Sequence, residues 1–364
     1  MSGGRDKSGE SLVQKLETAG YLLCDPAILQ PASTFLDLSG EDMRGRLLLT
    51  SDGAGGEFCL RPEFTIPVSL AYLASPQAGA PAAFCCYGPV FRQRPGKSTE
   101  FLQAGIESFG RVDREAADAE TLGLALEAAG PAAQNWRIRI GDAGLLTGLL
   151  AKLQLPPVWL RRIRSGLAKG QKIAEILAPV ADTSDHSGVL AALDGVDKPG
   201  ARALVEDLLK IAGIATLGGR TPSEIAERFL EQAELRSSAG LDQAKRVLLE
   251  RFFAIEGHCD ATSAELRTLF AAAGLDLAEE MASFDLRLNF LAARGVDINR
   301  ITFSTGFARN LDYYTGFVFE AGAPYAEPAI GGGRYDRLLA TLGAKTDIPA
   351  VGAAIWIDRL NGAQ

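Results

Sequence analysis

The sequence contains few of the residues that most often bind metals or form disulfides. Its 364 residues include two histidines and five cysteines, the latter at positions 24, 59, 85, 86 and 259. The cysteines show neither a C-x-x-C pair nor the Cys/His spacing of a zinc site, and neither histidine belongs to a Ser or Cys nucleophile motif. We therefore expect reduced cysteines, no metal, no cofactor and no histidine-based nucleophilic catalysis.

A long apolar segment is also missing. Hydrophobic residues make up 47% and charged residues 23% of the chain, and no apolar run is long enough to cross a bilayer. The first ten residues carry charge but lack the apolar core of a signal peptide. These features predict a cytoplasmic protein that does not enter a membrane.

The chain has no surplus of basic residues. Its formal net charge is −8 and its isoelectric point is about 5.1. Proteins that bind nucleic acid need Lys and Arg in excess on one face, so this balance weighs against nucleic acid as the main partner. Because tRNA-binding enzymes can be acidic overall, the charge alone does not decide the question.

The order of strand and helix signals predicts a sheet that the chain leaves and later rejoins. A helix ending at Gly20 and a helix over about 116–129 flank the early strands, and almost all signals between 144 and 285 are helical. Thr221 and Thr262 each begin a capping box there. We expect one core formed by 1–143 and 286–364, with 144–285 as a mainly helical insertion. Strands are predicted at 47–50, 58–60, 84–91, 101–109, 136–140, 301–307 and 313–320.

The segment from Leu102 to Phe109 alternates between apolar and polar residues. Gln103, Gly105 and Glu107 fall on one face of the predicted strand. An amide and a carboxylate separated by a residue without a side chain form a polar-edged gap that suits a planar group. The alternative is a solvent-facing strand surface, and this segment alone favours neither.

Three other segments carry polar groups next to apolar runs. Glu63 and Thr65 are suited to an ammonium group, and Arg92 leaves a strand as it would to meet an anion, although a basic hairpin tip explains Arg92 equally well. Nearer the C-terminus, 309–314 leads into a strand, and three glycines at 331–333 precede Arg-Tyr-Asp. Consecutive glycines indicate close backbone approach, a strained turn or a flexible loop.

Taken in order, these segments resemble the catalytic core of histidyl-tRNA synthetase, a class II synthetase fold. The resemblance implies an α+β fold, with an antiparallel sheet flanked by helices and a helical insertion. It covers most of the chain outside the helical middle. The matching segments are Arg61-Pro62-Glu63-x-Thr65, Tyr87–Arg92 with Gln103–Gly110 as motif 2, Arg309-x-Leu311-Asp312-Tyr313-Tyr314, Gly332-Gly333-Arg334-Tyr335-Asp336, and Ala350–Arg359 as motif 3.

The resemblance assigns a role to each candidate residue of a histidine site. Glu63 and Thr65 would hold the ammonium group, and Arg92 the carboxylate or an adjacent phosphate. Gln103 and Glu107 would take the imidazole, in agreement with the gap at Gly105. The pocket would be closed by Arg309, Tyr313 and Tyr314, with Tyr335 beside them.

The sequence departs from the synthetase pattern where the nucleotide would bind. Arg94 stands where the family has an acid that contacts adenine, and Trp356 stands where motif 3 has a glycine. An indole that buries about 150–250 Å² cannot share that space with a nucleotide. The motif 2 loop is also short, and only a few residues follow Arg359, so we expect no anticodon-binding domain.

Within the family, this combination resembles the regulatory subunits that pair with short-form catalytic chains of ATP phosphoribosyltransferase. It implies a non-catalytic role in the first step of histidine biosynthesis, with feedback by histidine as effector. It also implies a homodimer through motif 1, near Pro26 to Phe35. Two alternatives stay open: a truncated enzyme that forms histidyl-adenylate, and an assembly scaffold whose pocket is a relic.

Overall fold

The computed structural model describes residues 7–38, 44–178, 241–307 and 313–360, with two further helical positions, Ala203 and Asp207. The chain divides into two compact units: the first combines Met1–Leu149 with Phe253–Gln364, and the second is Leu150–Phe252. Within the described ranges, no helix is both long and apolar enough to span a membrane.

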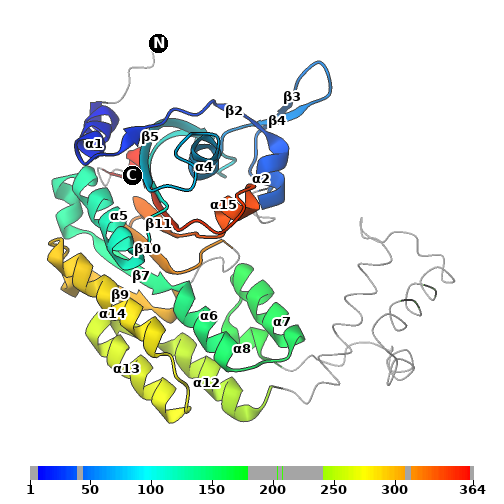
Figure 1. The fold of residues 1–364 in the computed structure, drawn as a ribbon, viewed down its shortest axis with the longest axis vertical. Coiled ribbons are helices and arrows are strands. Elements are labelled where there is room, and N and C mark those ends of the chain that lie inside the picture. The colour runs from blue at the N-terminus through cyan, green and yellow to red at the C-terminus, as the bar shows by residue number, and fades with distance from the viewer. Residues whose placement is uncertain are drawn as a thin grey trace. The chain divides into compact units, whose positions relative to one another are not determined.

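A nine-stranded sheet forms the centre of the first unit (Figure 1). Neighbouring strands of this sheet pair antiparallel, except that β1 pairs parallel with β5 and β7 pairs parallel with β9. Strands from the beginning and the end of the chain alternate in it, so the predicted α+β fold with a mainly antiparallel sheet is confirmed. The strand order is β1 (Leu22–Leu23), β5 (Ala82–Phe91), β6 (Glu100–Phe109), β12 (Ala350–Trp356), β11 (Ile330–Arg334), β10 (Phe317–Gly322), β7 (Arg137–Asp142), β9 (Ile301–Ser304) and β8 (Glu256–His258).

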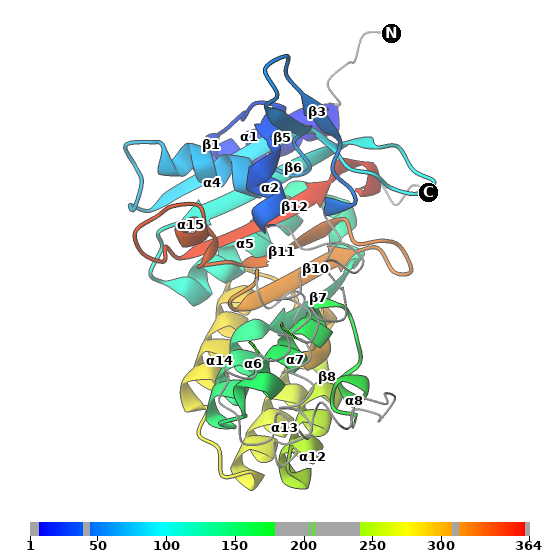
Figure 2. The same cartoon turned by 90° about the vertical axis from the view of Figure 1, so that its right-hand side faces the viewer.

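Helices cover both faces of the β5–β6–β12 part of the sheet. On one face, α4 (Thr65–Leu73) packs against β6, and Phe64 and Tyr72 join Phe101 and Phe109 in one apolar cluster. On the other, α5 (Arg114–Ala129) packs against β6, β11 and β12, behind the strands in Figure 2, and α14 (Ala278–Ala293) lies along α5 (Figure 1). Because side chains alternate along a strand, Gln103 and Glu107 lie on the same face as Phe101 and Phe109 and therefore face α4. Further helices of this unit are α1 (Lys7–Thr18), α2 (Ala32–Leu38), α13 (Cys259–Ala272) and α15 (Leu338–Thr341).

A smaller sheet leads into α4. It has the order β2 (Leu29–Pro31), β4 (Glu57–Leu60), β3 (Leu49–Ser51), with antiparallel pairs. Directly after β4, the buried Arg61 donates from Nε to the Pro89 carbonyl (3.0 Å) and lies over the Phe64 ring. Its Nη1 is 3.6 Å from Asp25 Oδ1. Arg61 thereby fixes the start of α4 against β5.

The helical signals in the middle of the chain correspond to helices in both units. α6 (Ala143–Lys152) and α12 (Gln243–Ala254) cross the unit boundaries, α7 (Pro157–Ala168) and α8 (Ile173–Ile176) lie in the second unit, and α13 and α14 lie in the first. The capping box expected at Thr262 is wrong: α13 begins at Cys259, and the Thr262 hydroxyl donates back to the His258 and Cys259 carbonyls. The capping box at Thr221 lies outside the described residues.

Two strand boundaries differ from their predictions by more than two residues. β9 ends at Ser304 because Thr305–Phe307 form a 3₁₀ turn, and β10 begins at Phe317, not at Tyr313. The backbone N–H of Thr315 donates to the Arg334 carbonyl (2.8 Å) before β10 starts. Tyr313 and Tyr314 therefore precede the strand and need not alternate as strand residues do, so both rings can turn toward the sheet face that carries Glu107.

Candidate functional site

The carboxylate of Glu107 is the meeting point of three elements. Glu107 lies on β6 with 2% of its surface exposed. The Thr65 hydroxyl, at the start of α4, donates to Oε1 (2.7 Å), and the Tyr335 hydroxyl, just after β11, donates to Oε2. Sequence positions 65, 107 and 335 are thus brought together, as the resemblance predicted for one site.

The strand beside Glu107 leaves room for its carboxylate. Gly352 on β12 pairs with Glu107, and a Cβ atom at 352 would lie 2.7 Å from the Glu107 carboxyl carbon. Any side chain at that position would displace the carboxylate. The gap predicted at Gly105 is narrower than expected, because Cys86 Sγ lies 2.6 Å from where a Cβ of residue 105 would be. A planar ligand would therefore contact a thiol as well as backbone.

The Glu63 carboxylate has a structural role that the sequence did not predict. Its Oε2 accepts from the Thr65 backbone N–H (2.6 Å) and its Oε1 from that of Ile66 (3.0 Å), so it caps the first turn of α4. A carboxylate oxygen has two lone pairs, so each can accept a further donor. Burial raises the pKa of Glu63, while these N–H groups and Arg92 oppose the shift.

Arg92 lies at the end of the site that carries further arginines. Burial lowers the pKa of Arg92 to about 10; Glu63 opposes this shift, and Arg94, Arg359 and Arg46 reinforce it. The Arg92 and Arg94 guanidinium groups lie 4.9 and 3.8 Å from the centre of the Phe101 ring. The positive charge is consistent with an anionic group of a ligand at this position.

Three tyrosine rings form one wall of the site. Tyr313 stacks on Tyr335 with ring centres 5.5 Å apart, and Tyr314 meets Tyr313 edge-on at 4.8 Å. The Tyr314 ring also lies over Gly333, within 2.9 Å of where a Cβ of that residue would be. Burial raises the pKa of Tyr313 well above its usual value, and Tyr314, Glu63 and Glu107 add to this shift. Burial also raises the pKa of Tyr335 well above its usual value, and there Glu107, Tyr313 and Glu63 add to the shift. Arg309, also expected here, lies outside the described residues.

Trp356 covers the opposite end of the same sheet face. It pairs with Gln103, which is 2% exposed, across β6 and β12. Its indole lies 3.3 Å from where a Cβ of Gly331 would be, and the Arg359 guanidinium lies over it at 4.7 Å. Arg359 is itself held by Glu327 Oε2 (2.8 Å). The space that a flat group would need above Gly331 is therefore filled by an indole and a guanidinium.

A hydrogen-bonded ion network that sequence reasoning missed lies on the α5 side of the sheet. Its members are all buried, which is rare for charged side chains unless they are paired. Arg334 and Asp336 belonged to a recognised motif, whereas the two helical members showed no signal beyond a charge within an apolar pattern. The network consists of Asp118, Asp142, Arg287, Arg334 and Asp336.

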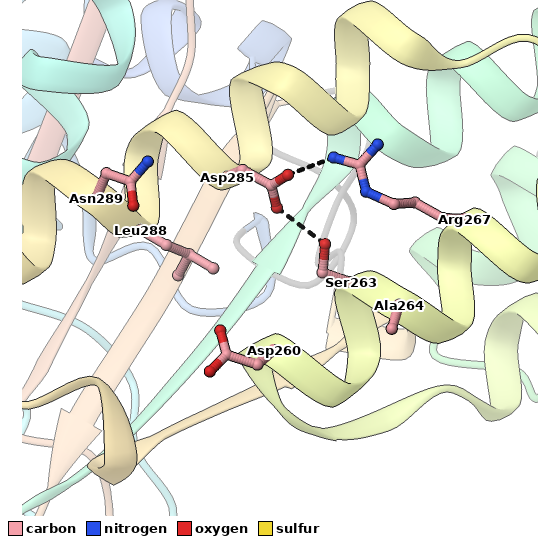
Figure 3. Close-up of a pocket in the computed structure, with 7 residues that line it drawn as sticks. All are labelled: Asp260, Ser263, Ala264, Arg267, Asp285, Leu288 and Asn289. Atoms are coloured by element: carbon pink, nitrogen blue, oxygen red, sulfur yellow. Dashed lines mark hydrogen bonds and ion pairs between the residues drawn. The ribbon is translucent and has the colours of Figure 1, made fainter.

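Two surface hollows lie away from the Glu107 site. Figure 3 shows a groove between α13 and α14, in which Asp285 accepts from Ser263 Oγ (2.9 Å) and from Arg267. A second hollow lies at the C-terminal end of α5, where Lys15 donates to the Ala128 carbonyl and Arg300 to that of Trp136. No predicted site residue lines either hollow. The groove is lined by Asp260, Ser263, Ala264, Arg267, Asp285, Leu288 and Asn289.

Comparison with known families and curated proteins gives matches over nearly the whole chain. The family model described as histidyl-tRNA synthetase matches residues 5–213 and 199–360. A protein of Mesorhizobium japonicum named ATP phosphoribosyltransferase regulatory subunit is 42% identical over 345 residues, which are 92% of this chain and 91% of that protein. A protein of the same name from Brucella anthropi is 37% identical over 372 residues, covering 98% and 97%.

Solved structures show the same fold. An ATP phosphoribosyltransferase regulatory subunit/histidyl-tRNA synthetase from Bacillus halodurans matches with a TM-score of 0.68 and 21% identity, covering 98% of this chain and 81% of that one. Histidyl-tRNA synthetase from Nostoc matches with a TM-score of 0.63 and 18% identity, covering 100% and 75%. At these identities the likeness establishes architecture.

The burial of Glu107 predicts a pH-dependent stability. Burial raises the pKa of Glu107 to about 8, against hydrogen bonds from Tyr335 and Thr65 that lower it. In the unfolded chain this carboxyl ionises near its usual pKa of 4.5, so between about pH 4.5 and 8 the unfolded state binds fewer protons and stability falls as pH rises. Glu107→Gln should flatten this part of the profile, measured by urea unfolding at a series of pH values.

The matched control is Glu100→Gln, an exposed carboxylate on the same strand. It should leave the pH profile as in the wild type. Equal pH dependence of the unfolding free energy in the wild type and in Glu107→Gln would contradict the assignment.

Proposed function

The chain belongs to the histidyl-tRNA synthetase family, in the branch of the ATP phosphoribosyltransferase regulatory subunits, and from this membership we propose that it is the non-catalytic subunit of a short-form ATP phosphoribosyltransferase. Its partner joins ATP to phosphoribosyl pyrophosphate in the first step of histidine biosynthesis, in the cytoplasm. This chain supports that reaction and mediates its feedback inhibition by histidine. The similarity to curated regulatory subunits along more than nine-tenths of both chains carries the proposal.

The geometry around Glu107 supports histidine as the effector. An imidazole N–H can donate to Glu107, the ammonium group to Glu63 and Thr65, and the carboxylate can accept from Arg92. Charge-assisted hydrogen bonds contribute about 1.5–3 kcal/mol each. After the cost of immobilising ligand and loops, a handful of them gives micromolar to millimolar affinity, about −8 to −4 kcal/mol. That range suits a protein that senses a metabolite.

The filled end of the sheet face supports a non-catalytic role. Trp356 and Arg359 occupy the space above Gly331, and Arg94 is 3.7 Å from Asp358 and stacked on Phe101. A nucleotide would have to displace an indole that is held from both sides.

Two alternatives give different results in simple assays. A truncated synthetase would catalyse ATP–pyrophosphate exchange that depends on histidine. An assembly scaffold would stimulate the catalytic subunit without binding histidine. The space filled by Trp356 opposes the truncated synthetase. The convergence of Thr65 and Tyr335 on the Glu107 carboxylate opposes the assembly scaffold.

The first prediction concerns histidine binding. Isothermal titration of the wild-type chain with histidine should give a dissociation constant between about 1 μM and 1 mM. Glu107→Gln keeps an oxygen that can accept the ring N–H but loses the negative charge, so it should weaken binding about 10-fold, the difference of roughly 1.4 kcal/mol between a charge-assisted and a neutral hydrogen bond. Glu100→Gln, exposed on the same strand, should bind as the wild type does. Equal affinities of wild type and Glu107→Gln would place histidine elsewhere.

The second prediction concerns self-association. Large apolar side chains near the predicted motif 1 are 42% to 53% exposed in the single chain, and such surfaces mark interaction sites. We propose that a second copy of this chain covers them. Sedimentation equilibrium should show a dimer for the wild type and a monomer for Leu22→Glu/Leu29→Glu. A monomeric wild type at micromolar concentration would refute the dimer. The residues are Leu22, Leu23, Ile28 and Leu29.

A further inference from the structure

Tyr335 joins the Glu107 site to the buried ion network on the other side of the sheet. Its hydroxyl donates to Glu107, and its backbone N–H donates to the Ala350 carbonyl (2.8 Å). The residues on either side of it, Arg334 and Asp336, are both members of the network. One step along the backbone therefore separates the group that touches Glu107 from the buried charges.

Asp118 on α5 is the centre of the network. It is fully buried, and each of its carboxylate oxygens holds one arginine. Oδ1 lies 2.7 Å from Arg334 Nη2 and accepts from Arg334 Nε (2.9 Å), while Oδ2 accepts from Arg287 Nε (2.9 Å). A shift of Arg334 would therefore change the position of Asp118 and, through it, of Arg287.

Arg287 carries the network into α14. Burial alone would lower the pKa of Arg287, but Asp142 and Asp118 raise it above its usual value, so it stays charged. Its Nη1 donates to Asp142 Oδ2 (2.7 Å), and Asp142 Oδ1 accepts from the Gly144 N–H (2.7 Å) in the first turn of α6. The network therefore ends on α14 and on the start of the helix that leads into the second unit.

The hydrogen bonds on Glu107 provide a switching step. The Thr65 hydroxyl donates to Oε1, and the Tyr335 hydroxyl donates to Oε2. Oε2 also lies against the Gly352 backbone, as the atom nearest to where a Cβ of that residue would be, which restricts the approach of a second donor. A ring N–H that approaches Oε2 therefore competes with the Tyr335 hydroxyl, whereas Thr65 is not next to any member of the network. Displacement of Tyr335 would pull on Arg334 and Asp336, which share its backbone.

We propose that a histidine ring displaces the Tyr335 hydroxyl from Glu107, and that the Arg334–Asp118–Arg287 network transmits this displacement to α14 and the start of α6. The inference rests on the proposed function and names the regulatory device of that site. A buried ion network is weak evidence for stability, because the cost of desolvating the charged groups offsets their mutual attraction. A purely structural role of this network therefore leaves its connection to Tyr335 unexplained. Transmission requires that the histidine site and α14 both respond to one element, the network next to Tyr335, and this response can be measured.

Hydrogen–deuterium exchange of the full chain tests the proposal after isothermal titration has established histidine binding. Saturating histidine should change the exchange rates of amides in Ala278–Ala293 about fivefold or more, the lower end of usual coupling between sites. Tyr335→Phe keeps the ring and loses the hydroxyl. This variant should bind histidine at least as tightly as the wild type, and its α14 exchange should no longer respond.

Tyr21→Phe is the matched control. Tyr21 is also buried and donates to a glutamate, Glu120 on α5 (3.3 Å), but among the described residues no hydrogen bond joins Tyr21 to a member of the network. The response of the Ala278–Ala293 amides to histidine in this variant should equal that of the wild type, whatever the variant does to the exchange next to Arg294.

Three outcomes would overturn the proposal. The first is a full α14 response in Tyr335→Phe, and the second is loss of histidine binding in that variant, since a group that the ligand displaces cannot be needed for affinity. The third is binding to the wild type without any change in α14. Failure of the wild type to bind histidine would instead reject the proposed function, and this inference with it.

Discussion

The burial of one carboxylate, that of Glu107, is the constraint on which the site depends. A carboxyl group in a sheet interior must have partners, and the chain supplies them from two distant segments, Thr65 and Tyr335. Gly352 gives the carboxylate room, and Glu63 and Arg61 fix the start of α4, which presents Thr65. A change in any of these groups would alter the position or the protonation of Glu107.

The parts of the fold that follow local rules could be predicted from the sequence. Strict alternation identified β6 and placed Gln103, Gly105 and Glu107 on one face, and a helix over about 116–129 was expected where α5 lies. The prediction failed where a side chain bonds to the backbone two to four residues away, and where a partner distant in the sequence decides the outcome. The back-bonding of Thr262 moved a helix start, Cys86 narrowed the gap at Gly105, and Glu63 caps a helix. The network around Asp118 joins positions more than 140 residues apart, which no local pattern reveals.

The two ends of the sheet face differ in the side chains that cover them. At one end, Glu107 and its tyrosines form a polar site bounded by glycines; at the other, Trp356 and Arg359 fill the space above Gly331. Solved structures named as histidyl-tRNA synthetases share the architecture of the sheet.

The most direct test of the account is the formation of phosphoribosyl-ATP by a short-form catalytic subunit, with and without this chain, across a histidine titration. The account predicts that the chain stimulates the reaction, that histidine reverses the stimulation, and that a complex with Glu107→Ala is stimulated but no longer responds to histidine. A catalytic subunit that is indifferent to this chain would contradict the regulatory role. Inhibition that persists unchanged in Glu107→Ala would place the histidine sensor outside this site.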